Sequence, residues 1–146
     1  MTFSVTSWHM TSLQRERASA VCVQNGHLLC VQLRDPTTQI ARMFVPGGAI
    51  EPGETPAAAA ERETFEETGF RVRCDARRVR VAHYPYVWNG RQFEVITHFL
   101  LATLLDPAQA AEPVVDAAYN EGVYWLPLAE VPEALSFLTV MQTEVM

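Results

Sequence analysis

Apolar and polar residues alternate along much of the chain, and this period of two predicts several β-strands. Two Asn-Gly pairs, Asn25-Gly26 and Asn89-Gly90, each separate two such segments, which is typical of tight β-hairpin turns. Residues 93–104 are apolar enough to form a central strand covered on both faces. The segments expected to form strands are residues 19–23, 28–33, 43–45, 70–74, 79–81, 84–88, 91–105 and 121–126.

Residues 56–68 have the features of an α-helix. Thr55 is a favoured N-cap, and Pro56 fits the first helical position. The four alanines Ala57–Ala60 have the highest helix propensity of any residue type. Gly69 can adopt the left-handed conformation that commonly ends a helix. These signals predict a helix that begins at Pro56 and ends just before Gly69.

Three glutamates, Glu63, Glu66 and Glu67, share one face of this predicted helix, because residues three and four positions apart lie together. Ala58 and Phe65 lie on the opposite face, which we expect to pack inward. Neighbouring carboxylates repel one another, and the helix dipole disfavours them near the C-terminal end. A hard divalent cation such as Mg²⁺ or Mn²⁺ would neutralise this repulsion. The alternative interpretation is an acidic helix face that contacts only solvent.

The remaining segments complete a single α+β domain over residues 1–146. Prolines and glycines at 46–48 and 52–53 predict turns in which glycine adopts a positive φ. Residues 127–146 predict a turn and then a helix that begins at Pro132. Residues 1–16 have little pattern and form either a short strand or a partly ordered N-terminal extension.

Composition narrows the classes of function. The net charge of −6 argues against binding to duplex nucleic acid, which normally requires a basic face. The chain has no secretion signal and no apolar run long enough to cross a membrane, so we expect a cytoplasmic protein. Cys22, Cys30 and Cys74 are scattered and odd in number, which fits neither a disulfide framework nor a zinc site.

The glutamates also belong to a longer pattern of fixed spacing, G-x5-E-x7-R-E-x2-E-E-x-G. This pattern resembles the Nudix box. The chain departs from the box at Thr64, where the family usually has an aliphatic residue that packs beneath the helix. The residues that match are Gly48, Glu54, Arg62, Glu63, Glu66, Glu67 and Gly69.

The resemblance implies an α/β/α sandwich with a mixed β-sheet. It also implies an enzyme that hydrolyses a diphosphate linkage with the help of Mg²⁺ or Mn²⁺. Glu63, Glu66 and Glu67 are the metal ligands that we expect from the helix face, and the resemblance adds the backbone carbonyl of Gly48.

The general base is less sharply defined by the sequence. In this family it is either a glutamate of the box, which here means Glu66 or Glu67, or an acidic residue of a later loop. Glu121, Asp116 and Glu112 are the candidates of the second kind, and each has the alternative interpretation of a solvated loop charge.

Several arginines have candidate roles. Arg62 and Glu54 resemble a pair that braces the metal ligands and holds the loop on the helix, and a plain structural salt bridge is the alternative. Arg34 and Arg42 flank the loop before the box and are candidates to bind substrate phosphates.

Aromatic residues suggest how a nucleobase could bind. Tyr84, Tyr86 and Trp88 alternate, so they lie on one face of a strand. We expect Tyr84 and Tyr86 to contact the substrate, because bases stack on aromatic rings. Ordinary packing in the core is the alternative.

The predicted substrate is a nucleoside diphosphate linked to another group, such as ADP-ribose or a dinucleoside polyphosphate. A nucleoside triphosphate pyrophosphatase that removes damaged nucleotides is the alternative among enzymes. A nucleotide-sensing domain without catalysis is the alternative outside them, and the complete set of acidic box residues favours an enzyme. We expect a small-molecule nucleotide as the partner, no duplex nucleic acid and no membrane, and a homodimer is the candidate assembly.

Overall fold

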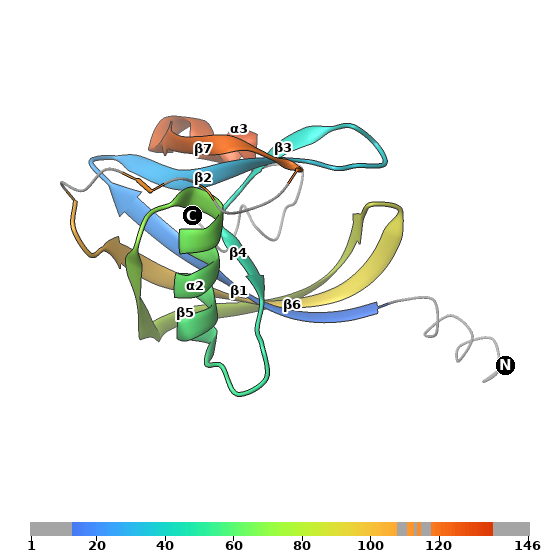
Figure 1. The fold of residues 1–146 in the computed structure, drawn as a ribbon, viewed down its shortest axis with the longest axis horizontal. Coiled ribbons are helices and arrows are strands. Elements are labelled where there is room, and N and C mark those ends of the chain that lie inside the picture. The colour runs from blue at the N-terminus through green and yellow to red at the C-terminus, as the bar shows by residue number, and fades with distance from the viewer. Residues whose placement is uncertain (1–12, 108–110, 113, 115–117, 136–146) are drawn as a thin grey trace, which may run out of the picture.

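The structure, a computed structural model, describes residues 13–107, 111–112, 114 and 118–135 (Figure 1). The fold consists of a mixed sheet, one well-formed helix and two short helical segments. The elements are β1 (Leu13–Gln24), β2 (His27–Arg34), β3 (Ala41–Phe44), β4 (Gly47–Ala49), α2 (Pro56–Thr68), β5 (Val72–Trp88), β6 (Arg91–Leu104), β7 (Asn120–Pro127), the 3-10 helix η1 (Leu128–Glu130) and α3 (Val131–Ala134).

The strands follow the order β3-β2-β1-β6-β5, with β4 also paired to β1 and β7 also paired to β2. The β1–β6 pair is parallel and the other pairs are antiparallel, so the sheet is mixed, as expected. Both predicted hairpin turns are present, and Asn25-Gly26 and Asn89-Gly90 all have the positive φ that these tight turns require.

Hydrophobic clusters lie on both faces of the sheet. Ala20 and Cys22 of β1 belong to a cluster with Ala59 of α2. Val21, which lies between them in the strand and therefore points the other way, belongs to a second cluster with Val131 of α3. Figure 1 shows α2 across the β1–β6–β5 part of the sheet and α3 beside β7. The expected α/β/α sandwich is therefore confirmed.

Helix α2 begins and ends where the sequence predicts. The Thr55 side chain accepts a hydrogen bond from the backbone N–H of Ala58 at 3.1 Å. Gly69 has a φ of 77°, and its N–H donates to the carbonyl of Phe65 at 2.9 Å. These two caps satisfy backbone groups that would otherwise lack partners at the helix ends.

The buried face of α2 differs from the prediction. Ala58 is exposed, and Phe65 is only partly buried, with the guanidinium of Arg71 centred 4.0 Å from its ring. Ala59 and Ala60 are fully buried instead. They face small residues of the sheet in the same hydrophobic cluster, so the helix can approach the sheet closely on its alanine side.

The strands also differ from the prediction in detail. β5 is continuous over residues expected to form three strands, and a register shift between Cys74 and Val79 absorbs the polar segment. β1 begins at Leu13, within the segment expected to be weakly ordered. Gly47 and Gly48 form β4 and lack the positive φ expected of turn glycines, whereas Gly53 has it.

Several predictions lie partly or wholly outside the described residues. Residues 1–12 and the predicted C-terminal helix beyond residue 135 belong to this group. Among the residues that the structure describes, no helix combines the length and apolar character needed to span a membrane. Cys22, Cys30 and Cys74 are buried free thiols, and burial raises the pKa of Cys30 to about 12.

Candidate functional site

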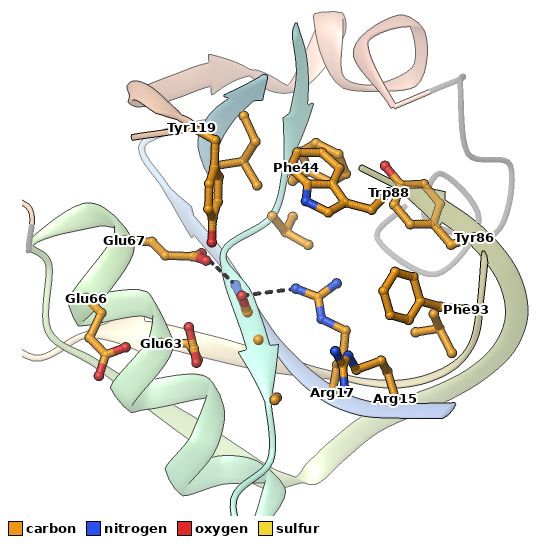
Figure 2. A pocket seen from close by; sticks show the side chains of 16 residues that line it. Arg15, Arg17, Phe44, Glu63, Glu66, Glu67, Tyr86, Trp88, Phe93 and Tyr119 are labelled. Carbon is orange, nitrogen blue, oxygen red and sulfur yellow. Dashed lines mark hydrogen bonds between the residues drawn. The ribbon is translucent and has the colours of Figure 1, made fainter. Parts of the chain in front are cut away.

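A cavity of about 410 Å³ opens between the acidic face of α2 and the curved ends of β1, β5 and β6 (Figure 2). The carboxylates of α2 line one side of it, with Tyr119 beside Glu67, and two arginines and further aromatic rings line the other side. The lining residues used below are Arg15, Arg17, Phe44, Gly47, Gly48, Glu63, Glu66, Glu67, Tyr86, Trp88, Phe93 and Tyr119.

Glu67 is the most deeply buried carboxylate of the cavity, with 6% of its surface exposed. Its Oε1 accepts a hydrogen bond from the backbone N–H of Gly47 at 3.0 Å. Its backbone carbonyl accepts a second one from the Asn120 side chain, also at 3.0 Å. Glu67 is thus held between β4 and the start of β7.

Glu63 lies directly against Gly48. A Cβ atom placed on Gly48 would overlap the Glu63 carboxylate, so no other residue fits at position 48 without moving this side chain. Burial raises the pKa of Glu63, and contacts with Arg62 oppose that rise. The predicted juxtaposition of Gly48 with the glutamate face is therefore present.

Arg62 connects the loop before α2 to the glutamates. Its guanidinium donates two hydrogen bonds to the carboxylate of Glu54, at 2.8 and 3.0 Å, and one to the carbonyl of Ala49 at 3.0 Å. It also contacts Glu63 at 2.9 Å and Glu66 at 3.4 Å. Hydrogen bonding from Arg62 lowers the pKa of Glu54 to about 2. The predicted Arg62–Glu54 pair is present with bidentate geometry.

The oxygen donors on this wall suit a hard divalent cation. In the described part of the chain, no three acidic, histidine or cysteine side chains are already arranged as a metal shell. Arg62 contacts Glu63 and Glu66, and the Gly47 N–H donates to Glu67. The partly desolvated carboxylate of Glu63 against Gly48 suits a nearby cation, because an opposite charge stabilises a buried carboxylate.

Arg34 and Glu121, expected to bind substrate and to act as a base, lie outside the cavity lining. They form a bidentate pair with distances of 2.6 and 3.0 Å, and Arg34 also donates to the carbonyl of Gln39. Hydrogen bonding from Arg34 lowers the pKa of Glu121, which makes it a weaker base. The pair joins β2 to β7.

Arg42 and Glu112 are also outside the cavity lining. Arg42 is exposed on β3. Glu112 is exposed, and its side chain lies 3.6 Å from Arg71. Asp116 lies outside the described residues.

Of the two tyrosines expected to bind substrate, the cavity includes only Tyr86. The Tyr84 hydroxyl forms a buried hydrogen bond with Thr97 at 2.8 Å, and Tyr84 packs in the core. Tyr86 lines the cavity together with Trp88, two positions further along the same face of β5. Burial raises the pKa of Tyr86 to about 12, so its hydroxyl stays protonated at neutral pH.

Sequence reasoning missed Arg15 and Arg17, which both line the cavity. The Arg17 guanidinium donates to the carbonyl of Gly47 at 3.1 Å, and that of Arg15 lies 5.0 Å from the centroid of the Phe93 ring. Their spacing of two was the available signal, because it places both on one face if the segment is a strand.

The model of the NUDIX domain matches residues 14–141. A MutT-like protein of Streptomyces ambofaciens is 40% identical over 58 residues, which cover 40% of this chain and 35% of that protein. The chain spans about a third of the length of the curated relatives it matches.

Solved structures agree with the fold. A NUDIX hydrolase from Nitrosomonas europaea is similar with a TM-score of 0.64 and 21% identity, covering 90% of this chain and 87% of that chain. A C. elegans Ap4A hydrolase in a binary complex gives 0.61 and 20%, covering 90% and 92%. Gly48, Glu63, Glu66 and Glu67 of the box line one side of the cavity, and the family model matches most of the sequence. The chain belongs to the NUDIX domain family.

Proposed function

We propose that this chain hydrolyses the diphosphate linkage of a nucleoside diphosphate derivative with the help of Mg²⁺ or Mn²⁺. The observation that carries this proposal is the acidic wall of the cavity, where Glu63, Glu66 and Glu67 face one space. Glu63 and Glu67 are also fixed in position by Arg62 and by the Gly47 N–H.

In this proposal some residues bind the cation, and Arg62 positions the side chains that bind it. A cation bound by Glu63, Glu66, Glu67 and the Gly48 carbonyl would neutralise the diphosphate and make a bound water more acidic. Arg62 restricts the side chains of Glu63 and Glu66, so that they keep their orientation in the absence of substrate.

The candidate for the general base is a glutamate of the helix. Glu66 is the most exposed of the three and has the longest contact with Arg62, so it can accept a proton with the least rearrangement. Glu121 is a poorer candidate, because it lies outside the cavity lining and is already paired with Arg34.

The leaving group distinguishes two candidate activities. The similarity in fold to a protein named Ap4A hydrolase fits a linked nucleoside diphosphate. The MutT-like relative favours the alternative, a nucleoside triphosphate pyrophosphatase. A sensing domain without catalysis would not need the complete acidic wall. Cytoplasmic location and homodimer formation stay predictions from the sequence.

The test is a panel of nucleotide derivatives with Mg²⁺ or Mn²⁺, read by phosphate release after treatment with a phosphatase. We expect turnover of at least one linked nucleoside diphosphate. In Glu67→Gln the kcat should fall by about 10²-fold or more, because the variant loses the charge that holds the cation.

Glu61→Gln is the matched control on the same helix. Glu61 does not line the cavity, and its carboxylate accepts the N–H of Cys74 at 2.9 Å, a bond that a glutamine oxygen can replace. Its activity should stay within a few-fold of the original protein. Equal activity of the two variants would contradict the proposed site.

A further inference from the structure

Arg15 and Arg17 are cations without an acidic partner among the residues that the structure describes. Within the part of the chain that the structure describes, the side chain of Arg17 donates a hydrogen bond to the Gly47 carbonyl, although a guanidinium carries five N–H donors. The guanidinium of Arg15 lies over the face of the Phe93 ring. In a chain of net charge −6, two arginines that line one cavity and form no ion pair among the described residues indicate an anion-binding surface.

Arg17 lies between the two sides of the cavity. Figure 2 shows its guanidinium between the glutamates of α2 and the rings of Tyr86 and Phe93. Burial raises the pKa values of both Glu63 and Tyr86, and the positive charge of Arg17 opposes that rise in each of them. The guanidinium is therefore close enough to act on both sides.

Phe44, Tyr86, Trp88 and Tyr119, here called the aromatic cluster, line the cavity. Figure 2 shows Tyr119 beside Glu67 and the other three rings farther from the glutamates of α2. Phe44 makes edge-to-face contacts with Tyr86 and Trp88, with ring centroids 6.4 and 6.2 Å apart. Trp88 makes a similar contact with Tyr119 at 5.8 Å. Rings fixed in this way offer a preorganised surface to a flat ligand.

We propose that Arg17 binds the phosphate nearest the nucleoside and that the aromatic cluster holds the base. The diphosphate then extends from Arg17 to the glutamate wall. This inference rests on the proposed function and specifies the orientation of its substrate. Arg15 lies next to Arg17 on the same face of β1 and lends further positive charge at the cavity mouth.

Binding experiments without metal test this orientation separately from hydrolysis. The full chain is titrated with ADP and with inorganic pyrophosphate in EDTA, and heat is measured by calorimetry. Arg17→Gln should weaken both ligands by about 10-fold or more, because a charge-assisted contact to phosphate is lost. Arg17→Lys should recover part of the affinity, since it restores the charge without the planar fork.

Trp88→Leu distinguishes the contribution of the base to binding from that of the phosphates. This variant keeps apolar bulk but removes the ring, so ADP should bind roughly fivefold more weakly while pyrophosphate stays within about twofold. Arg80→Gln is the control for the loss of an arginine, because Arg80 is exposed on β5 and does not line the cavity. Thermal unfolding of each variant verifies that it is folded.

The results distinguish this inference from the proposed function. Retention of ADP affinity in Arg17→Gln overturns the phosphate contact, even if the chain hydrolyses nucleotides. Equal weakening of ADP and pyrophosphate in Trp88→Leu overturns the base contact. Conversely, the expected pattern of binding supports the orientation even if no nucleotide of the panel is hydrolysed.

Discussion

Thr64 and Thr68 lie one turn apart on the buried face of α2, and their hydroxyl groups have opposite situations. The Thr68 hydroxyl donates to the Thr64 carbonyl at 2.6 Å and accepts from the Phe70 N–H at 3.1 Å. The Thr64 hydroxyl has no hydrogen-bond partner among the described residues, although it is fully buried. A buried polar group without a partner costs free energy of folding.

We therefore expect Thr64→Val to stabilise the fold by about 1 kcal/mol, because valine has the same shape without the unpaired hydroxyl. Thr68→Val should instead destabilise it by about 1–2 kcal/mol, since two hydrogen bonds are lost. Urea unfolding of both variants measures these changes. A loss of stability in Thr64→Val as large as that in Thr68→Val would contradict this account.

Position 64 shows what could and could not be predicted from the sequence for a single residue. The family pattern correctly indicated that Thr64 packs beneath the helix. The local pattern could not show which of the two hydroxyl groups has hydrogen-bond partners. The Thr68 hydroxyl reaches the carbonyl of Thr64 and the N–H of Phe70 only because of the backbone geometry at the end of the helix.

At the scale of elements, Arg62 joins the loop before α2 to the helix, and this contact depends on pH. The folded chain holds the pKa of Glu54 at about 2, well below its usual value of 4.5. The unfolded chain therefore takes up this proton more readily, so acid favours unfolding. The stabilisation is complete above about pH 5 and is lost as the pH falls towards 2.

We expect Glu54→Gln to be less stable than the original protein at pH 7, with the difference shrinking between pH 5 and pH 3. Free energies of unfolding in urea at several pH values provide the measurement. Glu51→Gln is the control, because Glu51 lies in the same loop but is 65% exposed and 4.0 Å from Arg62. A constant difference across this pH range would show that the carboxylate charge of Glu54 does not stabilise the loop.

Elements whose ends are marked by capping or turn residues were predicted well from the sequence. The way these elements pack against one another was not. The bounds of α2 follow from Thr55 and Gly69, whose effects are confined to one turn of helix. Its inward face was assigned wrongly, because four consecutive alanines leave the apolar side undefined. Only the small residues of β1 opposite Ala59 and Ala60 decide which side packs.

At the scale of the whole molecule, the cavity combines segments that are distant in sequence. Arg15 and Arg17 reach it because β1 pairs in parallel with β6, about 80 residues later, a pairing that no local pattern reveals. The Arg34–Glu121 pair has the same origin, since it joins residues 87 positions apart. The sequence therefore identified the glutamate wall, which is local, and Tyr86 on the other side of the cavity, but it missed Arg15 and Arg17.

Metal binding should stabilise the whole fold, because a cation that binds only the folded chain shifts the unfolding equilibrium. We expect Mg²⁺ or Mn²⁺ to raise the Tm of the metal-free protein by several degrees, which corresponds to about 1–3 kcal/mol at saturating concentrations. Thermal unfolding in EDTA and after addition of metal gives this shift without any need for a substrate.

The variants of α2 assign this shift to the glutamate wall. Glu67→Gln should lose most of the metal-induced rise in Tm, while its own metal-free Tm stays similar or increases, because one of three repelling charges is removed. Glu61→Gln should keep the full rise, since Glu61 contacts β5 and not the cavity. An equal rise in both variants would place the cation elsewhere on the molecule, and full hydrolytic activity after exhaustive chelation would exclude a required metal.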